Sequence, residues 1–186
     1  MNHNKATPNS IINELTEMTS VLIGKQLTEV WYHDGIDEDG TAYFLEDVSP
    51  SRHELMQGVD LVTNDGITIG FFWDWNSKKG EFQLSTIRES VGIKLEDGRV
   101  RFNQSEESHW SSHIGNTITN LTFSAGLHDN YRIKIICDCR IDFDDADPIW
   151  ICARQATDGC ISNGDDTIVV FTEQEARRIG IKVDAE

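Results

Sequence analysis

The sequence predicts an α+β protein dominated by antiparallel strands, with short helices near its two ends. Three observations carry this prediction. Apolar and polar residues alternate in many short segments, clusters of turn residues separate those segments, and helical spacing of apolar residues occurs only near residues 10–19 and after Thr172. The 186 residues include eight Phe, five Trp and three Tyr, which is enough for a folded core.

The first elements are a helix and two strands. Residues 10–19 carry a helical apolar face, with Ser10 as the expected N-cap, and the face comprises Ile11, Ile12, Leu15 and Met18. Residues 22–32 alternate loosely and predict a strand that ends at an acidic turn. A second strand is expected at 41–45.

A hairpin with strands at 59–63 and 67–73 follows. Asn64-Asp65-Gly66 separates the two apolar runs, and these residue types tolerate the positive φ of a tight turn. A turn at Lys78–Gly80 then leads to a strand at 81–87, whose core-facing residues are expected to be Phe82, Leu84 and Ile87.

A polar stretch at 90–112 divides the chain, although a small hairpin around Asp97-Gly98 fits within it. We expect one compact unit, 1–186, with halves at 1–92 and 108–186. The segment Ile114–Leu121 repeats the Ile-Gly start and the apolar spacing of Ile23–Val30. The halves are therefore candidates for a duplication, and chance similarity stays open.

The second half contains the clearest alternating strand and a closing helix. The strand at 132–143 places one apolar set on a single face: Ile133, Ile135, Cys137, Cys139, Ile141 and Phe143. Residues 149–153 and the nearly all-apolar 167–171 are further strands, the latter central. Thr172 and Glu175 form a capping-box pattern for a short helix that stops at Gly180.

Acidity is the strongest compositional signal. The chain has 32 acidic and 16 basic residues, a formal charge of −16. Residues 1–92 carry 15 acids and 6 bases, and the rest carry 17 acids and 10 bases, so both halves are acidic. Such a charge disfavours nucleic acid and anionic membranes as partners, and either serves solubility or attracts a basic protein. No targeting segment or long apolar run is present, which predicts a cytoplasmic protein with reduced cysteines.

No residue pattern predicts a cofactor or a resident metal. Cys137-Asp138-Cys139 is one residue short of a zinc knuckle, so the cysteines are interpreted as buried apolar residues. His109 and His113 lack the glutamate of a zincin motif. His33, His53 and His128 are expected at the surface, and a Gly-rich phosphate loop is missing from the sequence. A partial calcium-loop register at 35–46 is interpreted as a solvated turn.

Two acidic loops are the candidate binding surface. The first is 34–39, with Asp34, Asp37, Glu38 and Asp39, and the second is 142–147, with Asp142, Asp144, Asp145 and Asp147. Trp31 or Trp75 beside them would supply an aromatic anchor. Trp73 and Trp75 share a strand face with Phe71, and a core position is the favoured interpretation of that stripe.

In size, acidity, strand content and lack of a catalytic motif, the chain resembles the small acidic immunity proteins that protect bacteria from polymorphic or contact-dependent toxins. The resemblance implies an interaction protein that neutralises a basic, nuclease-like toxin domain, and it transfers no functional residues. Two alternatives stay open. One is a metal-dependent hydrolase using Asp142, Asp144 and Asp147, or His33 with Asp37; the other is a non-catalytic ligand-binding or scaffold domain.

Overall fold

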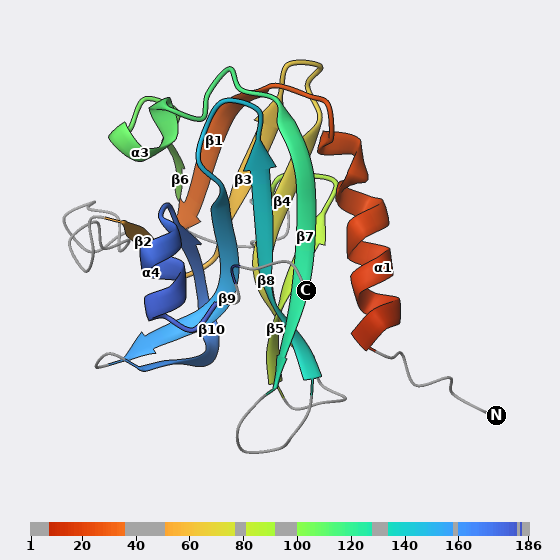
Figure 1. Cartoon of the computed structure of the whole chain (residues 1–186), viewed down its shortest axis with the longest axis vertical. Helices are drawn as coiled ribbons and strands as arrows, with labels where there is room; N and C mark the ends of the chain where they lie inside the picture. Colours follow the sequence, from red (N-terminus) through yellow and green to blue (C-terminus); the bar gives the residue numbers. More distant parts are fainter. Residues whose placement is uncertain are drawn as a thin grey trace.

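The computed structural model describes residues 8–35, 51–76, 81–91, 100–127, 134–157, 160–181 and 183. Within these ranges the chain forms two five-stranded antiparallel sheets and short helices, as the sequence predicts (Figure 1). The elements are α1 (Pro8–Thr19), η1 (Ser20–Leu22), β1 (Leu27–Asp34), β2 (Arg52–Leu55), β3 (Gly58–Thr63), β4 (Thr68–Asn76), β5 (Glu81–Ile87), β6 (Val100–Asn103), α3 (Ser108–Ser111), β7 (Ile118–Leu127), β8 (Lys134–Phe143), β9 (Ile149–Thr157), β10 (Cys160–Val170) and α4 (Glu173–Arg178).

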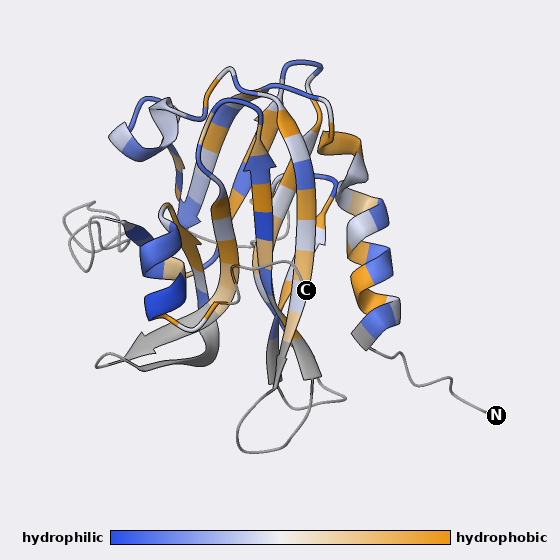
Figure 2. Cartoon of the chain, viewed as in Figure 1, coloured by the Kyte–Doolittle hydropathy of each residue, from blue (hydrophilic) through white to orange (hydrophobic). Residues whose placement is uncertain are grey.

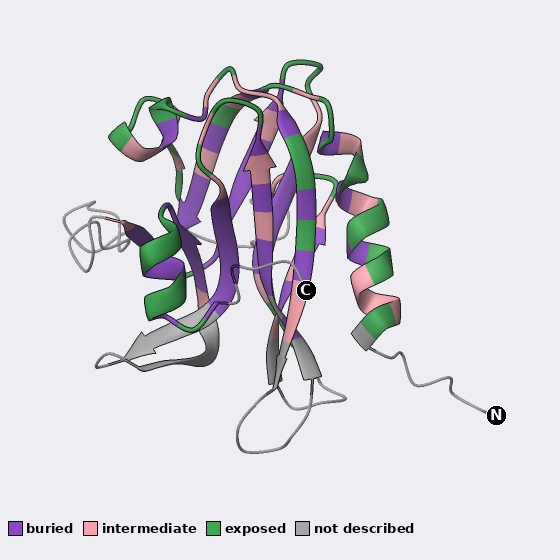
Figure 3. Cartoon of the chain, in the orientation of Figure 1, coloured by how far each residue is buried: buried purple, intermediate pink, exposed green. Residues whose placement is uncertain are grey.

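The two sheets pack face to face around a shared core. One has the strand order β5-β4-β3-β1-β6 and the other β2-β10-β9-β8-β7. Polar and apolar residues alternate along several strands, and the strands near the middle of the molecule are buried along much of their length (Figures 2 and 3). Because this arrangement buries one face of each sheet, the main core draws on both halves of the chain, with Tyr32, Leu61 and Phe71 from one sheet and Ile141 and Val169 from the other.

Helix α1 covers the side of the sandwich between β5 and β7 (Figure 1). The helix begins at Pro8, two residues before the predicted cap Ser10, and proline suits a first helical position because its missing N–H needs no partner there. The predicted face is correct: Leu15 is buried, and Ile11 and Ile12 pack against the core.

The predicted hairpin is confirmed, with β3 and β4 paired from Val62 opposite Thr68 to Gly58 opposite Phe72. Gly66 has φ +81° in its turn, the conformation for which glycine was expected. Strand β5 occupies the predicted 81–87, but Thr86 rather than Ile87 follows Leu84 into the interior. The predicted strand 41–45, the turn at Lys78–Gly80 and the hairpin turn at Asp97-Gly98 lie outside the described residues.

The strand predicted at 132–143 is β8, and its simple alternation is wrong. Ser124 pairs with Asp138 while the next residue, Ala125, pairs with Ile136, so Cys137 is an extra residue in the ladder. Because of this bulge, the residues of β8 before Cys137 face the opposite way from the prediction, and Ile136 and Cys139 are both fully buried. One inserted residue moves every side chain before it to the opposite face.

Helix α4 forms an outer layer on the second sheet. Ala176 and Ile179 cover Trp150, Cys152 and Ile168, whose side chains form a second apolar cluster outside the sandwich. The capping prediction holds in part, because the Thr172 hydroxyl accepts from the Glu175 N–H at 3.2 Å. The Glu175 carboxylate instead binds the buried Arg52 of β2 at 2.8 Å, together with Arg178 at 2.6 Å. Helix α4 is thereby tied to β2.

The two Ile-Gly segments that share a sequence pattern lie against each other. Gly24 donates to the Ile118 carbonyl at 2.8 Å, and the equivalent Gly115 donates to the Leu27 carbonyl at 2.7 Å. The segments cross at the bridge between Gln26 and Thr117, and both glycines have positive φ. Each then enters a four-stranded antiparallel series, β1-β3-β4-β5 or β7-β8-β9-β10. The shared ancestry of the halves stays a prediction.

None of the helices in the described part of the chain is long and apolar enough to cross a membrane.

Candidate functional site

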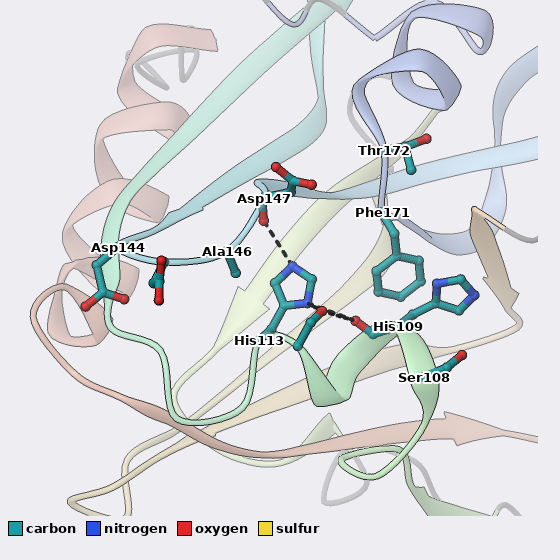
Figure 4. Close-up of a pocket in the computed structure, with 10 residues that line it drawn as sticks. Ser108, His109, His113, Asp144, Ala146, Asp147, Phe171 and Thr172 are labelled. Atoms are coloured by element: carbon teal, nitrogen blue, oxygen red, sulfur yellow. Dashed lines mark hydrogen bonds between the residues drawn. The ribbon is translucent and has the colours of Figure 1, made fainter.

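An open hollow of about 630 Å³ lies where α3 faces the turn between β8 and β9 (Figure 4). Three segments that are far apart in the sequence meet there: α3 with the residues after it, the β8–β9 turn, and the end of β10. The lining residues are Ser108, His109, Ser112, His113, Asp144, Asp145, Ala146, Asp147, Phe171 and Thr172. The described lining therefore contains three carboxylates and three hydroxyls but neither lysine nor arginine.

The three carboxylates come from the second predicted acidic loop. Asp144 accepts from the Thr117 backbone N–H at 2.8 Å, and this hydrogen bond lowers the pKa of the Asp144 carboxyl below its usual value. Asp145 and Asp147 are exposed. Asp142 belongs elsewhere, because it lies on β8 and binds Arg140 at 2.7 Å. In the predicted cluster, Asp142 is therefore paired with Arg140, and the other three aspartates line the hollow.

His113 joins α3 to the acidic turn. Its Nδ1 lies 2.9 Å from the His109 carbonyl oxygen and its Nε2 lies 3.0 Å from the Asp147 carbonyl oxygen. Figure 4 shows the imidazole between the two segments, and the ring is almost completely buried. The backbone of the β8–β9 turn is therefore held in place, so that its aspartates sit on a fixed support.

A buried network anchors the other side of α3. The Trp110 indole N–H donates to the Tyr32 hydroxyl at 2.6 Å, and that hydroxyl lies 2.7 Å from Nδ1 of His53. The ring of His109 stacks on Phe171 with centroids 4.8 Å apart, and His53 also packs against Phe171, at 4.9 Å. Burial, together with the nearby His109, lowers the pKa of His53 to about 4.

The prediction that His33 and His53 lie at the surface is wrong. His33 is buried and its Nε2 lies 2.7 Å from Oδ2 of the buried Asp60, which also accepts from the Ser90 hydroxyl. Gly70 makes room for this segment, since a Cβ there would lie 2.6 Å from Val91 Cγ2. His128 lies outside the described residues.

The Ser90, His33 and Asp60 cluster does not have the geometry of a catalytic triad. In a triad, one imidazole nitrogen faces the carboxylate and the other faces the serine. Here the same atom, Nε2 of His33, faces both Asp60 and the Ser90 oxygen, the latter at 3.4 Å. The cluster therefore fixes the segment after β5 to the outer face of β3.

The described residues contain no group of three His, Cys, Asp or Glu side chains arranged to hold a metal ion. Cys139 and Cys152 are buried free thiols, in agreement with their interpretation as core residues. Burial raises the pKa of the Cys139 thiol well above its ordinary value.

The chain matches no known protein-family model, no curated protein and no solved structure. Its function therefore has to be inferred from its own residues.

The other predicted site residues do not join the hollow. Asp34 is fully buried at the end of β1, and its carboxylate accepts from the Gly35 N–H at 2.7 Å. Trp31 lies under the Arg101 guanidinium. The expected core position of the stripe on β4 is correct for Phe71, and Trp73 packs against the core, but Trp75 is 50% exposed. Asp37, Glu38 and Asp39 lie outside the described residues.

Several lining residues were not predicted as a site. His109 and His113 were considered only as metal ligands, and Ser108, Ser112, Phe171 and Thr172 carried no signal of their own. Only the spacing of His109 and His113, four residues apart, could have indicated that they share a helical face. Their approach to the β8–β9 turn is a tertiary contact.

Proposed function

We propose that this protein is an acidic interaction protein that binds a basic protein partner at the hollow between α3 and the β8–β9 turn. The supporting observation is that Asp144, Asp145 and Asp147 line the hollow without a lysine or arginine among the other described lining residues. Because no lysine or arginine lies among these residues, the exposed carboxylates of Asp145 and Asp147 are available to a partner's cations.

The class of partner follows from the net charge of the protein and from the fixed turn that carries the aspartates. A chain of formal charge −16 speeds encounter with a basic surface through its long-range field. At close range, carboxylates on a fixed turn imitate the phosphates that a basic nuclease groove binds. This matches the resemblance to bacterial immunity proteins, so we propose a basic, nuclease-like toxin domain as the partner.

The experiment begins with the genes beside the one for this chain, among which we expect one that encodes a basic toxin domain. Isothermal titration calorimetry of the two purified proteins should give a dissociation constant well below micromolar, and the complex should lose nuclease activity. Affinity should fall as salt rises, because charged contacts are screened. The absence of such a neighbouring gene, or no binding at micromolar concentration, contradicts the proposal.

A pair of charge-reversal variants tests the location. In the double variant D145K/D147K the exposed rim changes sign, and we expect affinity to drop by at least about tenfold. The control E14K/E17K makes the same change in net charge at exposed positions of α1. Equal losses in the two variants would assign the effect to net charge and contradict a site at the hollow.

A further inference from the structure

Two arginines in the described part of the chain form no ion pair with a described aspartate or glutamate. The described lysine and arginine side chains are at positions 25, 52, 88, 101, 140, 177 and 178. Five of them form ion pairs with aspartate or glutamate. Arg88 and Arg101 form none within the described part of the chain, although acidic residues are twice as numerous as basic ones.

These two arginines line the same hollow, which is distinct from the acidic one. It has a volume of about 520 Å³ and is built from η1, the β3–β4 turn, the segment after β5, and β6. The lining residues are Val21, Gly66, Ile67, Thr68, Arg88, Glu89, Ser90 and Arg101. With two arginines and one glutamate, the lining carries a net charge of +1 inside a strongly acidic protein.

Both guanidinium groups are held by contacts that keep their charge. Arg88 donates to the carbonyl oxygens of Met18 and Glu17 at 3.2 and 3.3 Å, which fixes its plane against the end of α1. The guanidinium carbon of Arg101 lies 3.8 Å from the centre of the Trp31 ring, a cation–π contact. These contacts leave further N–H donors on each arginine for a ligand.

We propose that this hollow binds a small phosphate monoester. Two guanidinium groups from separate elements can bind different oxygens of a tetrahedral dianion, whereas a carboxylate fills the fork of a single arginine. Thr68 also lines the hollow, whereas the Ser90 hydroxyl already donates to Asp60. Val21 and Ile67 provide an apolar wall for the organic part of the ligand. This inference does not depend on the proposed partner.

Calorimetry with phenyl phosphate, inorganic phosphate, benzoate and phenol as probes tests the chemistry. Phenyl phosphate should bind most tightly, inorganic phosphate more weakly because it lacks the apolar part, and phenol not at all. Benzoate binding as tightly as phenyl phosphate would overturn the phosphate assignment. No binding of phenyl phosphate at 10 mM, a concentration on the order of the weakest measurable affinities, would overturn the site.

Substitutions test the assigned residues. Arg101→Gln leaves the contact of Arg88 with α1 intact. It should lower the affinity for phenyl phosphate by at least about tenfold, the loss expected for a charged contact. Arg88→Gln should lower the affinity by a similar factor, and a melting curve shows whether the loss of the Arg88 contacts with α1 destabilises the variant. The control Arg177→Gln removes an exposed arginine paired with Glu173 and should bind like the unmodified protein. Unchanged affinity in Arg101→Gln contradicts the proposal.

Discussion

Trp110 is the residue on which the wall of the acidic hollow depends. It is completely buried in the four-residue helix α3, which is too short to be stable by itself. Its indole packs edge-on against Phe171, with centroids 5.3 Å apart, and donates to the Tyr32 hydroxyl. We predict that truncating this side chain destabilises the protein more than any change at the exposed rim of the hollow.

The expected magnitude separates packing from hydrogen bonding. Trp110→Ala removes a buried aromatic side chain and should cost about 3–5 kcal/mol of unfolding free energy. Trp110→Phe keeps most of the packing and loses the hydrogen bond to Tyr32, whose hydroxyl retains His53 as a partner. This milder change should cost about 1–2 kcal/mol, the value of one hydrogen bond and a small cavity.

Urea unfolding followed by far-UV circular dichroism measures both costs. The transition midpoint should fall in the order unmodified, Trp110→Phe, Trp110→Ala, with an unchanged dependence on urea concentration. A cost below about 1 kcal/mol for Trp110→Ala would refute the role of Trp110 as the anchor of α3. Equal costs for the two variants would show that the hydrogen bond, rather than packing, holds the helix.

Three further predictions concern pH, backbone and charge. The pKa of His53 is lowered from 6.5 to about 4 in the folded protein, so as pH falls the unfolded chain binds a proton at this residue before the folded protein does. The free energy of unfolding should therefore fall as pH drops from about 6.5 to about 4. Denaturation curves of His53→Gln should lack this contribution to the pH dependence. Gly24→Ala and Gly115→Ala both place alanine at a positive φ, and the added Cβ meets no neighbouring atom at either position. Each substitution should lower the free energy of unfolding by about 1–2 kcal/mol, measured by urea unfolding. Very different costs would contradict the equivalence of the two segments. Glu175→Gln removes one of the two carboxylates at the buried Arg52, which keeps Glu54, and should cost about 2 kcal/mol, while Glu173→Gln, in an exposed pair, should cost less than about 1 kcal/mol in the same assay.

The sequence predicts what depends on local pattern. Alternation located β3, β4 and β5, and the capping pattern at Thr172 located α4, because these elements bury a periodic face or satisfy their own backbone. The bulge at Cys137 could not be predicted, since an inserted residue is defined only by the partner strand. Burial of His33 and His53 likewise depends on Asp60 and Tyr32, partners that are distant in the sequence.

The candidate site was predicted in one part only. The acidic loop at 142–147 was identified from its composition, and three of its four aspartates do line the hollow. Asp34 failed as a surface candidate because acidity alone does not show whether a carboxylate is at the surface or satisfied inside. The opposing wall, with His109 and Phe171, is formed by packing between α3 and the end of β10, which no local pattern encodes.

Hydrogen exchange of the complex tests the location of the partner most directly. Amide exchange would be measured by mass spectrometry for the free protein and for the protein saturated with the basic toxin domain. We predict new protection at 108–113 and 144–147, the segments that form the hollow, and little change along α1. Protection confined to α1 or to the segments around Arg88 and Arg101, with none at 144–147, would contradict this prediction.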